Sequence, residues 1–88
     1  MANCSNLKNI IILDGVKTIN SMAFVGCSQL KTIVLPKTLE NIYSYAFNQC
    51  NQIQTIYYGG TKKEWDDIAI SEGNQELSGA TLHCNYKL

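Results

Sequence analysis

The stretch of sequence that decides the fold covers residues 27–51 and reads CSQLKTIVLPKTLENIYSYAFNQCN. Partial copies of it lie on both sides, and they align with it when the chain is shifted by 23 residues. Each copy then has a cysteine followed by two regularly spaced leucine or isoleucine residues: Cys4, Leu7 and Ile10; Cys27, Leu30 and Ile33; Cys50, Ile53 and Ile56. Self-similarity at a fixed period is typical of a solenoid in which each repeat forms one coil.

Each coil is predicted to contain one short β-strand. Ile33 and Leu35 are two residues apart, so they point to the same face of a strand, whereas Thr32 and Val34 point to the other. Coils of equal length stack their strands in parallel, with the leucine and isoleucine side chains facing inward. The outward positions of the three coils are then Asn9, Ile11, Thr32, Val34, Thr55 and Tyr57.

A second extended segment is predicted on the other side of each coil, at residues 16–19 and 39–42. Both segments begin and end with an apolar residue, which we expect to face inward. A tight bend separates each of them from the preceding strand, as Asp14-Gly15 in the first coil and Pro36 in the second indicate.

A serine follows each of these segments, at Ser21 and Ser44, and an Ala-Phe pair comes two residues later. Serine is suited to capping the start of a helix, so we predict a single helical or 3₁₀ turn at each place. Phe24 and Phe47 recur at the repeat period, which favours a spine of aromatic rings in the coil interior over a ligand-binding role.

The repeat pattern breaks after residue 58. Thr61 and Glu64 form a T-x-x-E capping box that predicts the start of a helix. This helix is expected to cover the open end of the solenoid with an apolar face, because terminal repeats would otherwise expose their interior. Residues 80–84 alternate like a strand, and we expect them to add beside residues 53–58 as a fourth rung. The apolar face of the helix consists of Trp65, Ile68 and Ala69.

The segment Ala-Phe-x-x-Cys, at residues 23–27 and 46–50, combines with the spacing L-x-x-I-x-(I/L) to resemble the BspA-type leucine-rich repeats of bacterial and some protist surface proteins. The resemblance implies an α/β-type solenoid of about three 23-residue coils, curved, with a parallel β-ladder on one face. It also implies one leucine-rich-repeat domain over residues 1–88. Residues 1–58 would hold the repeats and residues 59–88 a C-terminal helix and strand cap.

Three of the four cysteines recur at the repeat period, and we expect each to be a small buried thiol in the same interior slot. A disulfide is the alternative, and the spacing disfavours it at Cys4, Cys27 and Cys50. A zinc site is disfavoured as well, because the chain has no C-x-x-C pair and a linear ladder does not present four ligands tetrahedrally.

Charge and composition argue against several classes of function. Seven basic residues balance seven acidic ones and none is arginine, so a nucleic-acid partner is not expected. No apolar run approaches the roughly 20 residues that span a bilayer. His83 and Cys84 are adjacent in a predicted strand and point to opposite faces, so they cannot act as base and nucleophile together. We therefore predict no enzyme activity, no cofactor and no bound metal.

The outward positions are the predicted partner-binding site, because curved solenoids hold partners on such extended surfaces. Strand propensity alone would also place β-branched residues there, and that alternative stays open. As the family resemblance implies, we expect a noncatalytic protein-binding or adhesion module, secreted or at the cell surface, with a protein or cell-surface ligand. The alternative function is a purely structural cap or spacer of a longer repeat array. Self-association is also expected, through an N-terminal end left uncovered at Leu7, Ile10, Ile12 and Phe24.

Overall fold

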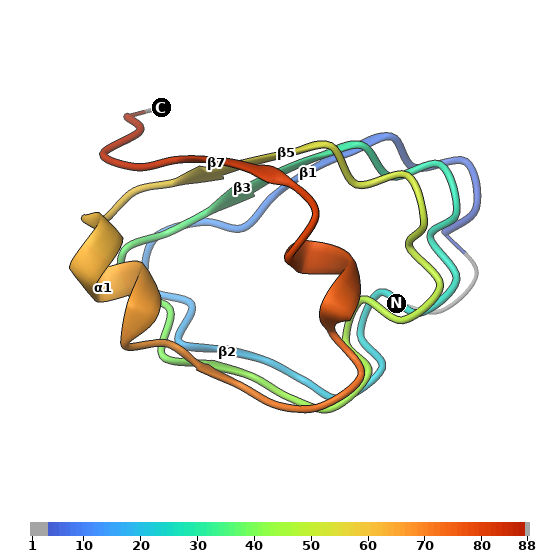
Figure 1. The fold of residues 1–88 in the computed structure, drawn as a ribbon, viewed down its shortest axis with the longest axis horizontal. Coiled ribbons are helices and arrows are strands. Elements are labelled where there is room, and N and C mark those ends of the chain that lie inside the picture. The colour runs from blue at the N-terminus through green and yellow to red at the C-terminus, as the bar shows by residue number, and fades with distance from the viewer. Residues whose placement is uncertain (1–3, 88) are drawn as a thin grey trace.

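Two parallel β-sheets face each other across one core in the computed structural model, which describes residues 4–87 (Figure 1). Residues 1–3 and 88, which the single-domain prediction includes, lie outside the described part. The larger sheet has the order β1-β3-β5-β7, with β1 at Asn9–Ile11, β3 at Thr32–Leu35, β5 at Thr55–Tyr58 and β7 at Thr81–His83. The smaller sheet has the order β2-β4-β6, with β2 at Thr18–Ile19, β4 at Asn41–Ile42 and β6 at Ala69–Ile70.

Strand register confirms the 23-residue period. Ile10 of β1 lies opposite Ile33 of β3, and Ile33 lies opposite Ile56 of β5. Ile19 of β2 lies opposite Ile42 of β4 in the smaller sheet. Equivalent residues of consecutive coils are therefore direct neighbours, as the sequence alignment predicts.

Backbone hydrogen bonds between equivalent positions hold the coils together. At the start of the larger sheet, the amide of Lys31 donates to the carbonyl of Lys8 at 2.8 Å, and the amide of Gln54 donates to the carbonyl of Lys31 at 2.9 Å. At the smaller sheet, the amide of Glu40 donates to the carbonyl of Lys17 at 2.8 Å. Each coil thus satisfies backbone groups of its neighbour, which buried backbone requires.

The core lies between the two sheets and contains the inward residues of every coil. Phe47 is fully buried, and its ring stacks on the half-buried ring of Phe24 with 5.4 Å between the centroids. The predicted aromatic spine is confirmed. Full burial of a side chain such as Phe47 contributes about 1.5 to 3 kcal/mol. The largest side chains with less than 2% of their surface exposed are Tyr58, Phe47, Leu30, Ile33, Leu35, Ile42, Ile56, Cys27 and Cys50.

The predicted helical turns after Ser21 and Ser44 are wrong, because residues 21–26 and 44–49 form a series of turns instead. Met22 and Tyr45 occupy the same column, and both have positive φ values, 62° and 60°. A left-handed residue interrupts the right-handed dihedrals that a helical turn needs. The amide of Met22 donates a hydrogen bond to the carbonyl of Ser44 at 3.2 Å, so the turns of consecutive coils also stack on each other.

The helix α1, Lys62–Asp66, begins as the capping box predicts but is shorter than expected. Thr61 Oγ1 accepts from the Glu64 amide at 3.1 Å, and Glu64 Oε1 accepts from the Thr61 amide at 2.9 Å. The prediction that Trp65, Ile68 and Ala69 share one helix face is wrong, because α1 ends at Asp66. Ile68 lies beyond the helix but is buried, whereas Ala69 belongs to β6 and is exposed. The amide of Ala69 donates to the carbonyl of Glu40 at 3.0 Å, and this bond draws the chain out of the helix and into the smaller sheet.

The coil that starts with β5 is therefore a complete but longer coil. Thr81 of β7 lies opposite Thr55 of β5, a spacing of 26 residues, which confirms the predicted fourth rung. Ala69 of β6 lies opposite Asn41 of β4, a spacing of 28. Inserting α1 lengthens the first half of the coil, and the 3₁₀ helix η1, Gln75–Leu77, shortens the second.

Two side chains replace backbone acceptors in this last coil. Between the first two coils, Phe24 and Gly26 donate to the carbonyls of Ala46 and Asn48. The equivalent amides of the next coil donate to side chains instead, that of Phe47 to Asn74 Oδ1 at 3.0 Å and that of Gln49 to Glu76 Oε2 at 3.1 Å. Asn74 is buried, and its Nδ2 also donates to the carbonyls of Tyr43 and Ser71, at 2.9 and 3.0 Å.

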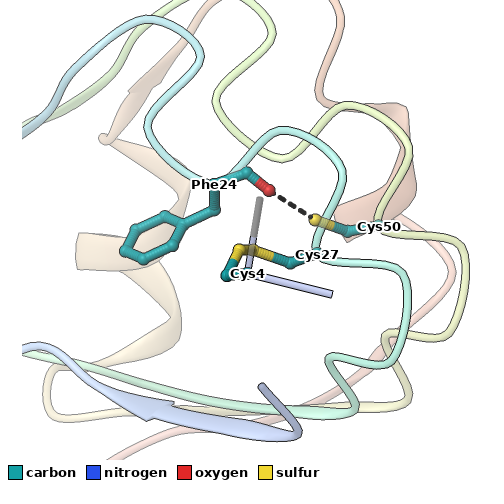
Figure 2. The surroundings of a disulfide bond; sticks show 4 residues. All are labelled: Cys4, Phe24, Cys27 and Cys50. Atoms are coloured by element: carbon teal, nitrogen blue, oxygen red, sulfur yellow. Dashed lines mark hydrogen bonds between the residues drawn. A yellow bond between two sulfur atoms is a disulfide. The ribbon is translucent and has the colours of Figure 1, made fainter. Parts of the chain in front are cut away.

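The prediction of free thiols is wrong for Cys4 and Cys27, which are joined by a disulfide (Figure 2). The in-register stacking of the coils brings their Cα atoms to 4.8 Å, within the range that disulfides need. Cys50 is a free buried thiol as predicted, and its Sγ donates to the carbonyl of Phe24 at 3.1 Å.

Removing the disulfide is expected to lower the free energy of unfolding by about 3 kcal/mol, because the bridge closes a loop of 23 residues in the unfolded chain. The measurement is urea denaturation followed by circular dichroism, with and without a phosphine reductant. The reductant should destabilise the unaltered protein and the Cys50→Ala variant by the same amount. It should leave the Cys4→Ala/Cys27→Ala variant unchanged, and an equal response of that variant would contradict the assignment.

Asn74→Ala is expected to cost about 2 to 3 kcal/mol of stability, because it leaves the buried Phe47 amide without its acceptor and removes the donor to the carbonyls of Ser71 and Tyr43. Gln75→Ala is the matched control, since the neighbouring Gln75 side chain is exposed, and it should change stability by less than about 0.5 kcal/mol. Equal costs for the two variants in urea denaturation would rule out the bridging role.

Candidate functional site

The outer face of the larger sheet carries the predicted site residues in two columns. Asn9, Thr32 and Thr55 continue into Thr81, and Ile11, Val34 and Tyr57 continue into His83, as the strand register shows. Ile11 is 53% exposed, and Asn9 is exposed. Thr32, Thr55 and Tyr57 are half-buried.

The prediction of a fully exposed apolar column is wrong at Val34, because only 9% of this residue is exposed. In-register stacking places Ile11 and Tyr57 on its two sides, and Tyr86 lines the same surface depression. Val34 thus supports its neighbours and offers little contact area of its own. The accessible part of the column consists of its ends.

Three aromatic side chains gather at the C-terminal end of this column and form the aromatic cluster, Tyr57, His83 and Tyr86. The ring of Tyr57 stacks on His83 with 5.0 Å between centroids and tilts against Tyr86 with 4.6 Å. The sequence analysis missed His83 as a site residue. The fourth rung that it predicted could have placed His83 beside Tyr57.

Tyr86 reaches the cluster through the fold of the chain end. Asn85 has a φ of 59°, and its amide donates to the carbonyl of Gly60 at 2.8 Å. The amide of Tyr86 then donates to the carbonyl of Tyr58 at 2.9 Å. No periodicity extends to residue 86, so the sequence carries no signal for this contact.

A cleft lies where the strands of the larger sheet end, and we name it the strand-end cleft. Its volume is about 330 Å³. It borders the outer face, because Val34 belongs to both. The lining residues come from the ends of the strands, the bends that follow them and the chain end: Ile12, Asp14, Val34, Leu35, Pro36, Lys37, Gly59, Tyr86 and Lys87.

His83 and Cys84 lie on opposite faces, as predicted. His83 is exposed on the outer face beside Tyr57, whereas the half-buried Cys84 packs against the core. Within residues 4–87, no three His, Cys, Asp or Glu side chains converge in a way that could hold a metal ion. No helix in this described range is long and apolar enough to span a membrane.

The expected self-association would use the N-terminal end of the solenoid, which the first coil forms. β1 and β2 are the edge strands at the N-terminal side of the two sheets. Leu7, Ile12 and Phe24 are half-buried, but only 9% of Ile10 is exposed, so the expectation of an uncovered edge is wrong at Ile10. Self-association stays a prediction.

Comparisons with known proteins agree on one kind of repeat. The family model described as "BspA type Leucine rich repeat region (6 copies)" matches residues 1–85. A leucine rich cell surface protein from Faecalibacterium prausnitzii, solved by crystallography, matches 77% of this chain with 36% identity and a TM-score of 0.73. The match spans 18% of that protein. No curated protein matches the chain.

The two free thiols are expected to react with iodoacetamide at different rates in the native protein. Burial raises the pKa of the Cys50 thiol and nearby Glu76 raises it further, while a hydrogen bond from the Cys27 backbone opposes them. Cys50 therefore has little thiolate at pH 8 and is covered, so it should label only after unfolding. Cys84 is half-buried and should label first. Mass spectrometry of time points measures both rates, and faster labelling of Cys50 would contradict this order.

Proposed function

This chain belongs to the BspA-type leucine-rich repeat family, and we propose that it is a noncatalytic protein-binding or adhesion module that works outside the cell or on its surface. The partner would contact the outer face of the larger sheet. The proposed contact residues are Asn9, Ile11, Thr32, Val34, Thr55 and Tyr57, with His83 added.

The observation that carries this proposal is the continuous column from Ile11 to His83. Parallel register places its members side by side on four strands, so the column is one surface and not a set of scattered residues. Its ends are an aliphatic side chain that is 53% exposed and a group of three aromatic rings. Exposed apolar and aromatic side chains bordered by polar ones are typical of protein interaction surfaces.

Two observations support a location outside the cytosol. The Cys4–Cys27 disulfide fits an oxidising compartment, because disulfides are rare where thiols are kept reduced. The similar structure from Faecalibacterium prausnitzii is described as a cell surface protein.

A purely structural role is the alternative. In that case residues 59–88 would act only as the C-terminal cap of the repeats in residues 1–58, and the whole would end or space a longer array. The buried contacts of Asn74 and the helix α1 serve either role equally well. Exposed residues of the outer face are what distinguish the two.

Changing Ile11 at one end of the column and Tyr57 in the aromatic cluster tests the proposal. Ile11→Lys/Tyr57→Lys is expected to weaken binding to a surface or extracellular-matrix ligand by at least about tenfold, because charge at the contact must be desolvated. The measurement is solid-phase binding to an array of purified cell-surface and matrix proteins. Val34 is left unchanged, since its substitution would disturb folding.

Tyr43→Lys is the matched control, because Tyr43 is 42% exposed and directly follows β4 of the smaller sheet. It should leave the affinity for every ligand on the array unchanged. Thermal unfolding must show that all variants fold. If the folded double variant binds as well as the unaltered protein, or if the unaltered protein binds nothing on the array, the structural role is favoured instead.

A further inference from the structure

We propose that the strand-end cleft binds an acidic peptide segment, with an aliphatic side chain seated on the cleft floor and its carboxylates between Lys37 and Lys87. This inference rests on the proposed function, because it names the class of partner that the outer face would hold. The cleft borders that face at Val34 and Tyr86, so one extended segment could contact both.

The position of the cleft follows from the repeat. Asp14 and Lys37 are equivalent residues one coil apart, and each begins the turn that follows a strand of the larger sheet. At the preceding position the first two coils carry Leu13 and Pro36, but the third carries Gly59. A Cβ atom on Gly59 would lie 3.2 Å from the backbone nitrogen of Lys37, so the glycine permits a close approach and leaves its own side of the cleft without a side chain.

The floor is apolar and rigid. Val34, Leu35 and Pro36 are all buried, and Leu35 lies in a strand that is hydrogen-bonded on both sides. Tyr86, which is 37% exposed and whose ring packs against Tyr57, lines one side of the cleft. About 330 Å³ is at the lower end of the volumes of small-ligand pockets, which suits one side chain and its backbone better than a large ligand.

The charges at the mouth favour an anionic occupant. Lys37 and Lys87 are exposed, and among residues 4–87 the one acidic side chain that lines the cleft with them is Asp14. Among the described residues, both ion pairs lie on or directly after α1, between Lys62 and Asp66 and between Lys63 and Asp67. The two cleft lysines are outside these pairs, so their charge is available to a partner.

A peptide fits these observations better than an acidic sugar does. Sugars stack on free aromatic faces, and Tyr86, the aromatic residue that lines the cleft, already packs against Tyr57. The half-buried Ile12 also lines the cleft and has exposed aliphatic surface, which suits contact with a leucine or isoleucine side chain. The chain has no arginine for bidentate recognition of phosphate, which disfavours a nucleic acid.

The experiment is an NMR titration of the isotope-labelled full chain with three probes. These are an acetylated, amidated hexapeptide of alternating leucine and glutamate, the same peptide with lysine in place of glutamate, and a hyaluronan tetrasaccharide. The acidic peptide should shift the amide signals of Lys37, Gly59 and Tyr86. In Lys37→Glu/Lys87→Glu its affinity should fall about tenfold or more, because two attractive charges become repulsive.

Lys8→Glu/Lys31→Glu is the matched control, since it makes the same change in net charge at exposed lysines near the opposite ends of the strands. It should retain the cleft shifts and lose at most about twofold in affinity through long-range charge. An equal loss in both variants, equal binding of the lysine peptide, shifts by the tetrasaccharide at the cleft in place of the peptide, or no shifts at all would each overturn the inference.

Failure here is distinguishable from failure of the proposed function. If the cleft signals do not move, but Ile11→Lys/Tyr57→Lys still abolishes binding to a ligand on the protein array, the outer face is functional and only the acidic-peptide inference is wrong. If the cleft binds the acidic peptide while that double variant keeps all its array binding, the cleft works independently of the outer face. The inference then stands only as a separate peptide site, and its role in the proposed function is lost.

Discussion

The structure depends on one constraint, the stacking of equivalent residues of consecutive coils in register. Backbone amides donate to carbonyls of the neighbouring coil at equivalent positions, as from Lys31 to Lys8 and from Gln54 to Lys31. A change of register by one residue would turn every inward side chain of a strand outward. The equal length of the first two coils therefore maintains both the hydrogen bonds and the core, because each isoleucine of a column packs on the next.

The last coil shows how strict this constraint is. It is longer than the others, yet β6 and β7 return to register with β4 and β5. Where its altered backbone no longer provides acceptors, Asn74 and Glu76 provide them through their side chains. The coil can thus hold the helix α1 over the core, with Trp65 in edge contact with Tyr58 at 5.3 Å, without leaving the amides of Phe47 and Gln49 unpaired.

The same stacking produces the candidate site. A column of the sequence alignment becomes a continuous row on the outer face, and the bends after the strands become the walls of a cleft. The direction of Ile11 and Tyr57 could be predicted, because alternation in a strand is a local property. The burial of Val34 could not, because it depends on the side chains of two other strands and on Tyr86, which no repeat position specifies.

The sequence by itself determined the period, the parallel ladder, the inward and outward faces, the aromatic spine and the start of α1, since each follows from spacing along one strand, one repeat or one helical turn. Only the tertiary structure decided the disulfide between Cys4 and Cys27, the left-handed turns at Met22 and Tyr45, the return of Ala69 to the smaller sheet and the cleft beside Tyr86. The physical reason is that these features depend on distances between coils. A repeat shows which residues become neighbours, but how close their atoms come is decided by the packing of the whole stack.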